Sequence, residues 1–147
     1  MTNSITEAHT GFIRALRTFK TNENLIVTGG YDSLVKIFDI RENNSIDGSE
    51  QEARAQSTFK HKNEIQGITL FQDDTKMAVV EGKNTNLWDL RKPDEPLQSL
   101  SFNNKTVNTV RSFESQNRLI TSSIDCHLKI FELDTVSFIY LSKPMNY

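Results

Sequence analysis

Cysteine is almost absent from this sequence, and neither sign of charge is in marked excess. Cys126 is the only cysteine, so an internal disulfide or a paired-cysteine metal or redox motif cannot form. The 17 lysine and arginine residues stand against 19 aspartate and glutamate residues, which gives a formal net charge of −2. Direct binding to a nucleic acid duplex, which requires clustered positive charge, is therefore disfavoured, and the lone thiol favours a reducing compartment.

Glycine and long apolar runs are also scarce. Only 6 glycines occur, and neither GxxxxGK[ST] nor GxGxxG is present, so nucleotide chemistry is not supported. The apolar runs are much shorter than the roughly 20 residues of a membrane-spanning helix, and the first residues lack the features of a secretion signal. We expect no membrane association, and we interpret the sequons at Asn43 and Asn104 as fortuitous.

What the sequence does contain is an internal repeat. Three segments share an ending, LVKIFDI at 34–40, NTNLWDL at 84–90 and HLKIFEL at 127–133. The aromatic residues of these endings are 50 and 43 residues apart, close to the roughly 40–45 residues of a four-stranded propeller blade.

The starts of the three segments agree as well. HTGFIRAL begins at His9, HKNEIQGI at His61 and NNKTVNTV at Asn103. The distance from each start to the acidic residue after the aromatic is 30, 28 and 29 residues, so two anchors keep a nearly constant separation. Short β-rich runs separated by turn residues lie between and after these anchors, which predicts four strands in each segment.

The repeat predicts an all-β fold over residues 1–147, with about three four-stranded blades. We place blade one at about 9–60, blade two at about 61–102 and blade three at about 103–142. The polar stretch 41–56 accounts for the longer first interval, and we interpret it as a loop between the third and fourth strands.

The pattern His…(Thr/Ser)-Gly-Gly/Ser-x-Asp…Trp-Asp resembles WD40 repeats over essentially the whole chain. The resemblance implies a β-propeller in which a Trp N–H, a Ser or Thr hydroxyl, the His and an Asp form a buried hydrogen-bonded chain in each blade. The matching positions are His9, Thr28 and Asp32 in blade one, His61 and Trp88 in blade two, and Thr121 and Asp125 in blade three.

No blade retains all four members of this chain of hydrogen bonds. The departures are Phe38 in blade one, Ala78 and Gly82 in blade two, and Asn103 and Phe131 in blade three. Because these residues lack the required donors or acceptors, or offer different ones, we expect the blades to be less rigidly held than complete ones.

Within the large WD40 family, two stretches are most similar to the WD-repeat subunits of the small-subunit processome, the t-UTP group of U3 small nucleolar RNA-associated proteins. These stretches are TGGYDSLVKIFDIR and NNKTVNTV…LITSSIDCHLKIFEL. The resemblance implies a nucleolar role in early ribosomal RNA transcription and processing. It also implies a seven-bladed propeller followed by a helical C-terminal region, which these 147 residues do not include.

Three arrangements of reactive residues have structural explanations that we prefer. Thr28, His9 and Asp32 could serve as nucleophile, base and acid, but WD40 repeats use the same positions to join strands. Cys126 beside His127 is interpreted as a surface turn, and Asp73-Asp74 as a hairpin turn stabilised by its own side chains. We therefore expect no enzyme activity, cofactor, metal or small-molecule substrate.

The predicted function is a protein-interaction scaffold in a large ribonucleoprotein assembly, in the nucleus and nucleolus, with any RNA contact indirect. The alternative is a general WD40 adaptor, for example one that presents substrates to a ubiquitin ligase in the cytoplasm. The candidate contact residues lie where strand starts and turns converge: Phe12, Tyr31, Lys62, Glu64, Thr106 and Ile124.

Three blades cannot close a ring, because propellers have about four to eight. We expect the flat faces of blades one and three to be open, with apolar residues short of partners: Ile26, Val35, Ile37, Ile120, Leu128 and Ile130. Further chain, self-association or a partner protein must then cover them.

Overall fold

The computed structural model describes residues 5–42, 54–113, 117–133 and 137–140. Within these ranges the chain forms three four-stranded antiparallel sheets. The first contains β1 (Ile13–Thr18), β2 (Leu25–Gly30), β3 (Leu34–Asp39) and β4 (Ser57–Lys60). The second contains β5 (Ile65–Leu70), β6 (Lys76–Glu81), β7 (Asn84–Asp89) and β8 (Gln98–Leu100). The third contains β9 (Val107–Ser112), β10 (Arg118–Ser123), β11 (Leu128–Glu132) and β12 (Ser137–Tyr140).

The prediction of an all-β fold with three four-stranded blades is confirmed. In every sheet the strands lie in the order of the chain, so each blade is a simple meander. Most of the predicted polar loop, residues 43–53, lies outside the described residues. No helix in the described ranges is long and apolar enough to cross a membrane.

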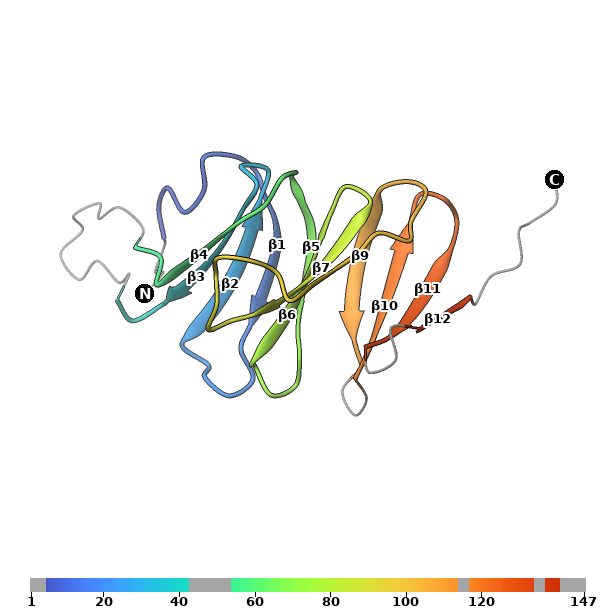
Figure 1. Cartoon of the computed structure of the whole chain (residues 1–147). Helices are drawn as coiled ribbons and strands as arrows, with labels where there is room; N and C mark the ends of the chain where they lie inside the picture. The colour runs from blue at the N-terminus through green and yellow to red at the C-terminus, as the bar shows by residue number, and fades with distance from the viewer. Residues whose placement is uncertain (1–4, 43–53, 114–116, 134–136, 141–147) are drawn as a thin grey trace.

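The three sheets stand side by side, as adjacent sectors of a disc do (Figure 1). The first strands of the sheets are neighbours, because β5 contacts β1 on one side and β9 on the other. Ser112 on β9 joins β5 through its hydroxyl, which donates to the Leu70 carbonyl at 2.7 Å and lies 3.2 Å from the Thr69 hydroxyl. Between blades one and two, the Asp74 carboxylate accepts from the Thr21 N–H at 2.6 Å and from the Thr21 hydroxyl at 2.8 Å. Hydrogen bonds therefore connect each pair of blades beside the apolar packing.

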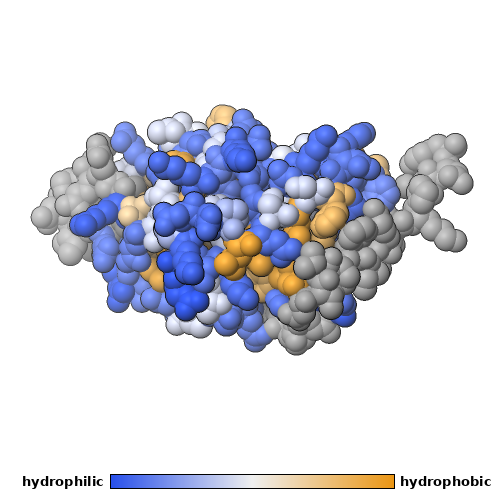
Figure 2. All heavy atoms as spheres, in the orientation of Figure 1, coloured by the Kyte–Doolittle hydropathy of each residue, from blue (hydrophilic) through white to orange (hydrophobic). Residues whose placement is uncertain are grey.

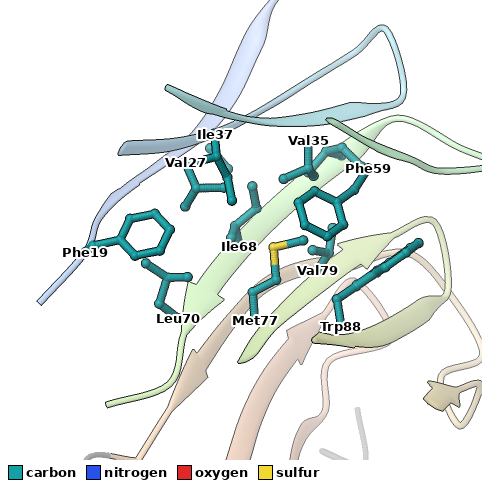
Figure 3. Close-up of a cluster of buried hydrophobic side chains, with 12 residues drawn as sticks. Phe19, Val27, Val35, Ile37, Phe59, Ile68, Leu70, Met77, Val79 and Trp88 are labelled. Atoms are coloured by element: carbon teal, nitrogen blue, oxygen red, sulfur yellow. The ribbon is translucent and has the colours of Figure 1, made fainter. Parts of the chain in front are cut away.

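The packing between blades one and two forms the larger apolar core. The first blade contributes five residues of its sheet and Phe19, which follows β1; the five are Ala15, Val27, Val35, Ile37 and Phe59. The second sheet meets them with Ile65, Ile68, Leu70, Met77, Val79 and Trp88 (Figure 3). The Phe59 and Trp88 rings meet edge to face at 5.4 Å.

The packing between blades two and three repeats this arrangement. Blade two presents Phe71, Ala78, Val80, Leu87 and Leu100, and blade three presents Val107, Val110, Leu119 and Phe131. All nine side chains are buried. The middle sheet is therefore covered on both faces, which explains why every residue of β6 and β7 after the first is buried.

The open faces differ in part from those that the sequence predicts. Val35 and Ile37 are only 0% and 6% exposed, because they point at blade two, so their assignment to an open face is wrong. Successive residues of a strand point to opposite faces, and the prediction did not separate the two faces of β3. Ile26 faces away from blade two, as predicted, and it is half-buried. In blade three Leu128 is exposed, while Ile120 and Ile130 are half-buried.

Gly29 allows blades one and two to approach closely. A Cβ placed on Gly29 would lie 2.6 Å from Ile65 Cγ2 and 2.7 Å from Ile68 Cδ1, which is closer than carbon atoms can pack. The first glycine of the TGG sequence, Gly29, is thus required by the contact with the next blade rather than by an unusual backbone angle.

Replacing Ile68 by Ala tests whether this contact stabilises the fold. Ile68 is fully buried between blades one and two, so Ile68→Ala leaves a cavity that two sheets must tolerate. We expect the free energy of unfolding to fall by about 2–5 kcal/mol in a denaturant titration. Leu97→Ala is the control, because Leu97, the residue before β8, is 50% exposed. Equal effects of the two substitutions would contradict the packing described here.

Candidate functional site

Blade one contains the predicted network of three polar side chains. His9 precedes β1, Thr28 lies on β2, and Asp32 lies in the turn between β2 and β3. The His9 ring lies with Nε2 2.8 Å from the Thr28 hydroxyl and Nδ1 2.9 Å from both Asp32 oxygens. With the ring proton on Nδ1, His9 donates to Asp32 and accepts from Thr28. The network therefore joins the start of the blade to its central hairpin.

The Asp32 carboxylate is kept ionised within this network. Burial opposes its ionisation most strongly, but hydrogen bonds from His9 and from the N–H groups of Thr10 and Leu34 outweigh burial and lower its pKa. The side chains of His9 and Asp32 are 0% and 6% exposed. Thr28 is 3% exposed, so its hydroxyl is almost closed to solvent.

Blade two replaces this network with one centred on Glu81, which the sequence analysis missed. Glu81 accepts from the N–H groups of Lys62 and Asn63 at 2.8 and 2.9 Å, and from the Asn86 amide. The Asn86 carbonyl oxygen in turn accepts from the Ser99 hydroxyl at 2.6 Å. Burial raises the pKa of Glu81, but the neighbouring His61 and the two N–H groups outweigh it, and the net shift is downward.

His61 and Trp88 are close together, as predicted, but they do not form the expected hydrogen-bonded chain. Their rings lie 5.0 Å apart, and His61 Nδ1 is 3.7 Å from Glu81. Within the described residues, neither the His61 nitrogens nor Trp88 Nε1 has a hydrogen-bond partner. Trp88 therefore acts through apolar contact with Phe59 and His61.

A shorter turn explains why blade two differs. Residues 82–83 connect β6 to β7, with Gly82 at a φ of +53°, whereas residues 31–33 connect β2 to β3. The strand pairing is therefore shifted by one residue. In blade one Thr28 pairs with Lys36, and in blade two Val79, rather than Ala78, pairs with the corresponding residue Asn86. Ala78 would occupy the hydroxyl position only if the turns of the two blades were equal in length, so its predicted place in the network is wrong.

In blade three a buried lysine takes over part of the network. Lys129 is 2% exposed; its amine donates to the Phe102 carbonyl at 2.6 Å and lies 3.6 Å from Asp125. Burial opposes ionisation of Asp125, but the His127 N–H and the charge of Lys129 outweigh it and lower its pKa. Within the described residues, the Thr121 hydroxyl and the Asn103 amide have no hydrogen-bond partner, although both side chains are buried. Thr121 and Asp125 are therefore not joined as the resemblance implies.

The lysine has a counterpart in blade one that the sequence analysis also missed. Lys36 donates to the Ala8 carbonyl at 2.8 Å, as Lys129 does to Phe102. Both carbonyls belong to the residue just before the His9 or Asn103 position. The shared Lys in LVKIF and HLKIF was the signal that could have identified this contact.

An aspartate–arginine clasp closes the third strand of blades one and two. Asp39 accepts from the Arg41 backbone N–H at 2.9 Å and from its guanidinium at 3.0 and 2.6 Å. Asp89 and Arg91 repeat this geometry, with distances of 2.9, 3.0 and 2.9 Å. The side-chain hydrogen bonds from the arginines lower the pKa of both aspartates from 3.8 to about 2.

The predicted contact residues lie at one rim of the blades, and all of them except Thr106 are exposed. Phe12 and Tyr31 are 81% and 37% exposed and meet edge to face at 6.1 Å. Ile124 is 52% exposed, and Lys62 and Glu64 are exposed. Thr106 is half-buried and accepts the Ile124 N–H through its carbonyl at 3.0 Å, so its predicted exposure is wrong. The face of the molecule drawn in Figure 2 is mostly hydrophilic, with hydrophobic residues in a few patches.

Two other predicted features lie at turns. Cys126 is exposed between β10 and β11, which confirms its assignment to a surface turn. Asp73 accepts from the Thr75 N–H and hydroxyl at 3.2 and 2.7 Å, as predicted for a turn residue. Among the described residues, no group of three or more His, Cys, Asp or Glu side chains could hold a metal ion.

Comparison with known proteins identifies the chain's relatives. Residues 4–144 match the family model for the nucleolar protein 10-like N-terminal domain, a β-propeller. The U3 small nucleolar RNA-associated protein 15 homolog of Xenopus tropicalis is 30% identical over 84% of this chain and 22% of that protein. Its Gallus gallus counterpart is 27% identical over 90% of the chain and 24% of that protein. The Saccharomyces cerevisiae protein of that name is 26% identical over 84% and 23%. The chain thus spans about a quarter of the length of these relatives.

Solved structures confirm the fold. The structure of U3-55K superimposes with a TM-score of 0.79 at 13% identity, over 97% of this chain and 43% of that one. The WD40 repeats of RRP9 give a TM-score of 0.78 at 13% identity, over 97% and 42%. The predicted WD40-type partial propeller is therefore correct.

Valine substitutions in two blades test the networks. Thr28→Val removes the hydroxyl bonded to His9, so the free energy of unfolding should fall by about 1–3 kcal/mol in a denaturant titration. Thr121→Val is the matched control, because Thr121 pairs with Lys129 as Thr28 pairs with Lys36 but its hydroxyl has no partner in the described residues. We expect Thr121→Val to be neutral or stabilising; a larger loss at Thr121 than at Thr28 would refute the assignment.

The aspartate–arginine clasps predict a pH dependence. The pKa of about 2 for Asp39 and Asp89 in the folded chain lies below the usual 3.8. The contribution of the clasps to the stability of the fold is therefore complete above about pH 4 and is lost as the pH falls toward 2. We expect the denaturation midpoint to fall over this range. The double variant Asp39→Asn, Asp89→Asn should lose part of that slope, and an unchanged slope would show that the clasps do not contribute.

Proposed function

Because this chain belongs to the nucleolar protein 10-like N-terminal domain family, we propose that it is a protein-interaction scaffold within a nucleolar ribonucleoprotein assembly that processes ribosomal RNA. The observation that supports this proposal most directly is the sequence similarity to proteins named U3 small nucleolar RNA-associated protein 15, which extends over 84–90% of the chain. The subcellular site that follows is the nucleolus.

The polar networks favour a scaffold over an enzyme. Thr28, His9 and Asp32 are ordered as a nucleophile, base and acid would be, but each bond joins one part of blade one to another. In blades two and three different side chains hold the start of the blade, Glu81 in blade two and Lys129 in blade three. A task that several residue types can fulfil is structural, because catalysis at this position would need the particular chemistry of the hydroxyl and imidazole.

The rim residues are suited to protein contact. Phe12 and Tyr31 form an exposed aromatic pair whose backbones are joined by a 2.9 Å hydrogen bond from the Tyr31 N–H to the Phe12 carbonyl. A preorganised aromatic pair is typical of an interface hot spot, since it loses little freedom on binding. Lys62 and Glu64 add charges of opposite sign to the neighbouring blade, which favours a protein partner over an RNA backbone. We propose that contact with RNA is indirect.

Affinity purification from nuclear extract tests the function. The tagged wild-type chain should recover protein subunits together with U3 small nucleolar RNA, measured by mass spectrometry and reverse-transcription PCR. Nuclease treatment before purification should remove the RNA and leave the directly bound proteins, because the proposed contacts are with protein.

The rim is tested with the double variant Phe12→Ala, Tyr31→Ala, which should reduce recovery of the bound proteins at least about tenfold. Leu97→Ala serves as the control at an exposed apolar residue outside the rim, and should recover them as the wild type does. Recovery of ubiquitin ligase subunits without U3 RNA would favour the adaptor alternative. Loss of all proteins after nuclease treatment would show that RNA carries the association.

A further inference from the structure

The arginines of the first strands have no carboxylate partner, unlike other arginines of the chain. β1, β5 and β9 are each the edge strand of a sheet, and β5 lies between the other two (Figure 1). These strands contain Arg14, Arg17 and Arg111 and no aspartate or glutamate. None of the three arginines forms an ion pair with a described residue. Three arginines outside the first strands each pair with a carboxylate: Arg41, Arg91 and Arg118.

Arg17 and Arg111 occupy the same position in blades one and three. Each is the fifth residue of a six-residue first strand, and Arg17 is half-buried while Arg111 is exposed. In β5 the same position holds Thr69, which is buried and whose hydroxyl lies 3.2 Å from the Ser112 hydroxyl. The arginine pair therefore flanks a strand that contributes no charge of its own.

Both guanidinium groups lie at the free edge of their strand. The Phe19 N–H bonds to the Leu25 carbonyl, and bonded pairs alternate along an antiparallel ladder, so the Leu16 carbonyl points away from β2. Arg17 Nη1 donates to this carbonyl at 2.6 Å. Arg111 makes the same contact with the carbonyl of the residue before it, at 2.8 Å. Each guanidinium thus uses one of its five N–H donors on the described residues, and the others are available to a ligand.

The two positive charges oppose one another. Burial lowers the pKa of Arg17, and the positive charge of Arg111 lowers that pKa further. Acidic residues are not scarce in the chain, since 19 stand against 17 basic ones, yet the fold places no described carboxylate at ion-pair distance from either arginine. An anion bound between the two guanidinium groups would relieve their repulsion.

A second row of polar side chains lies nearer the rim. Each first strand has a bulge at the same place, and the extra residues in the bulges are Arg14, Gln66 and Asn108. Arg14 and Asn108 are exposed and Gln66 is half-buried. Guanidinium and amide N–H groups donate to carboxylates and to peptide carbonyls alike. The first strands therefore carry hydrogen-bond donors suited to a peptide as well as positive charge.

We propose that the first strands bind an extended acidic segment of a partner protein, whose carboxylates pair with Arg17 and Arg111. An acidic peptide is favoured over single-stranded RNA because the three strands contain no aromatic side chain on which a base could stack. The arginine pair lies toward the ends of β1 and β9, whereas Phe12 and Tyr31 lie beside the start of β1. The inference therefore concerns a second surface and does not rest on the proposed function of the rim.

Fluorescence anisotropy of a labelled octaglutamate peptide mixed with the purified 147-residue chain tests the proposal. The wild type should bind the peptide at low ionic strength, and added salt should weaken the binding. The double variant Arg17→Gln, Arg111→Gln should bind at least about tenfold more weakly, because it removes both charged donors. Arg41→Gln, Arg91→Gln is the matched control, since it changes the net charge equally at arginines already paired with aspartates. The control should bind as the wild type does.

Two further measurements separate this site from RNA binding and from the rim. A labelled oligouridylate of equal charge should bind more weakly than the peptide, and Phe12→Ala, Tyr31→Ala should leave peptide binding unchanged. The proposal is overturned if the wild type does not bind the peptide, if both arginine double variants lose binding equally, or if the RNA binds more tightly. If Arg17→Gln, Arg111→Gln lacks the wild-type circular dichroism spectrum, Arg111→Gln alone replaces it, because Arg111 is exposed, and it should still weaken binding.

Discussion

The burial of sheet faces against one another is the interaction on which the rest of this structure depends. A four-stranded meander has two flat faces and no apolar interior of its own, so each blade is stable only where another blade packs on it. Ile65 and Ile68 are fully buried because the apolar face of blade one packs on them, and the absence of a side chain at Gly29 allows that approach. The face pattern is repeated in every blade, while the residues around it vary.

The polar networks vary because several chemistries can satisfy the same buried positions. Each network must join the start of a blade to its central hairpin. His9 with Asp32 does so in blade one, Glu81 with backbone N–H groups in blade two, and Lys129 with Asp125 in blade three. All three include a carboxylate whose pKa is lowered although burial opposes its ionisation. What is common to the blades is thus an ionised, hydrogen-bonded carboxylate, more than any one set of four residues.

The sequence was sufficient for the fold class, the number of strands and the blade one network, because each depends on spacing or on local residue type. Turn length in blade two was not predictable from the repeat, and one residue fewer between β6 and β7 exchanges Ala78 for Val79 in the register. Glu81 was missed for the same reason, since it aligns with Tyr31 when the turns are assumed equal. The direction of Val35 and Ile37 needed knowledge of which face of β3 meets blade two.

The rim and the open faces are separable surfaces, because they consist of different residues. The rim residues come from segments between strands, as Tyr31 and Ile124 do, whereas the open faces consist mainly of residues within strands, such as Leu16 and Ile130. Strand register fixes the face residues, because a shift of one position would expose the buried side chains. Turn length affects this register, but the identity of the exposed turn residues does not, provided that the carboxylate within each network still holds the blade start. Contact residues at the rim can therefore change without disturbing the packing that joins one blade to the next.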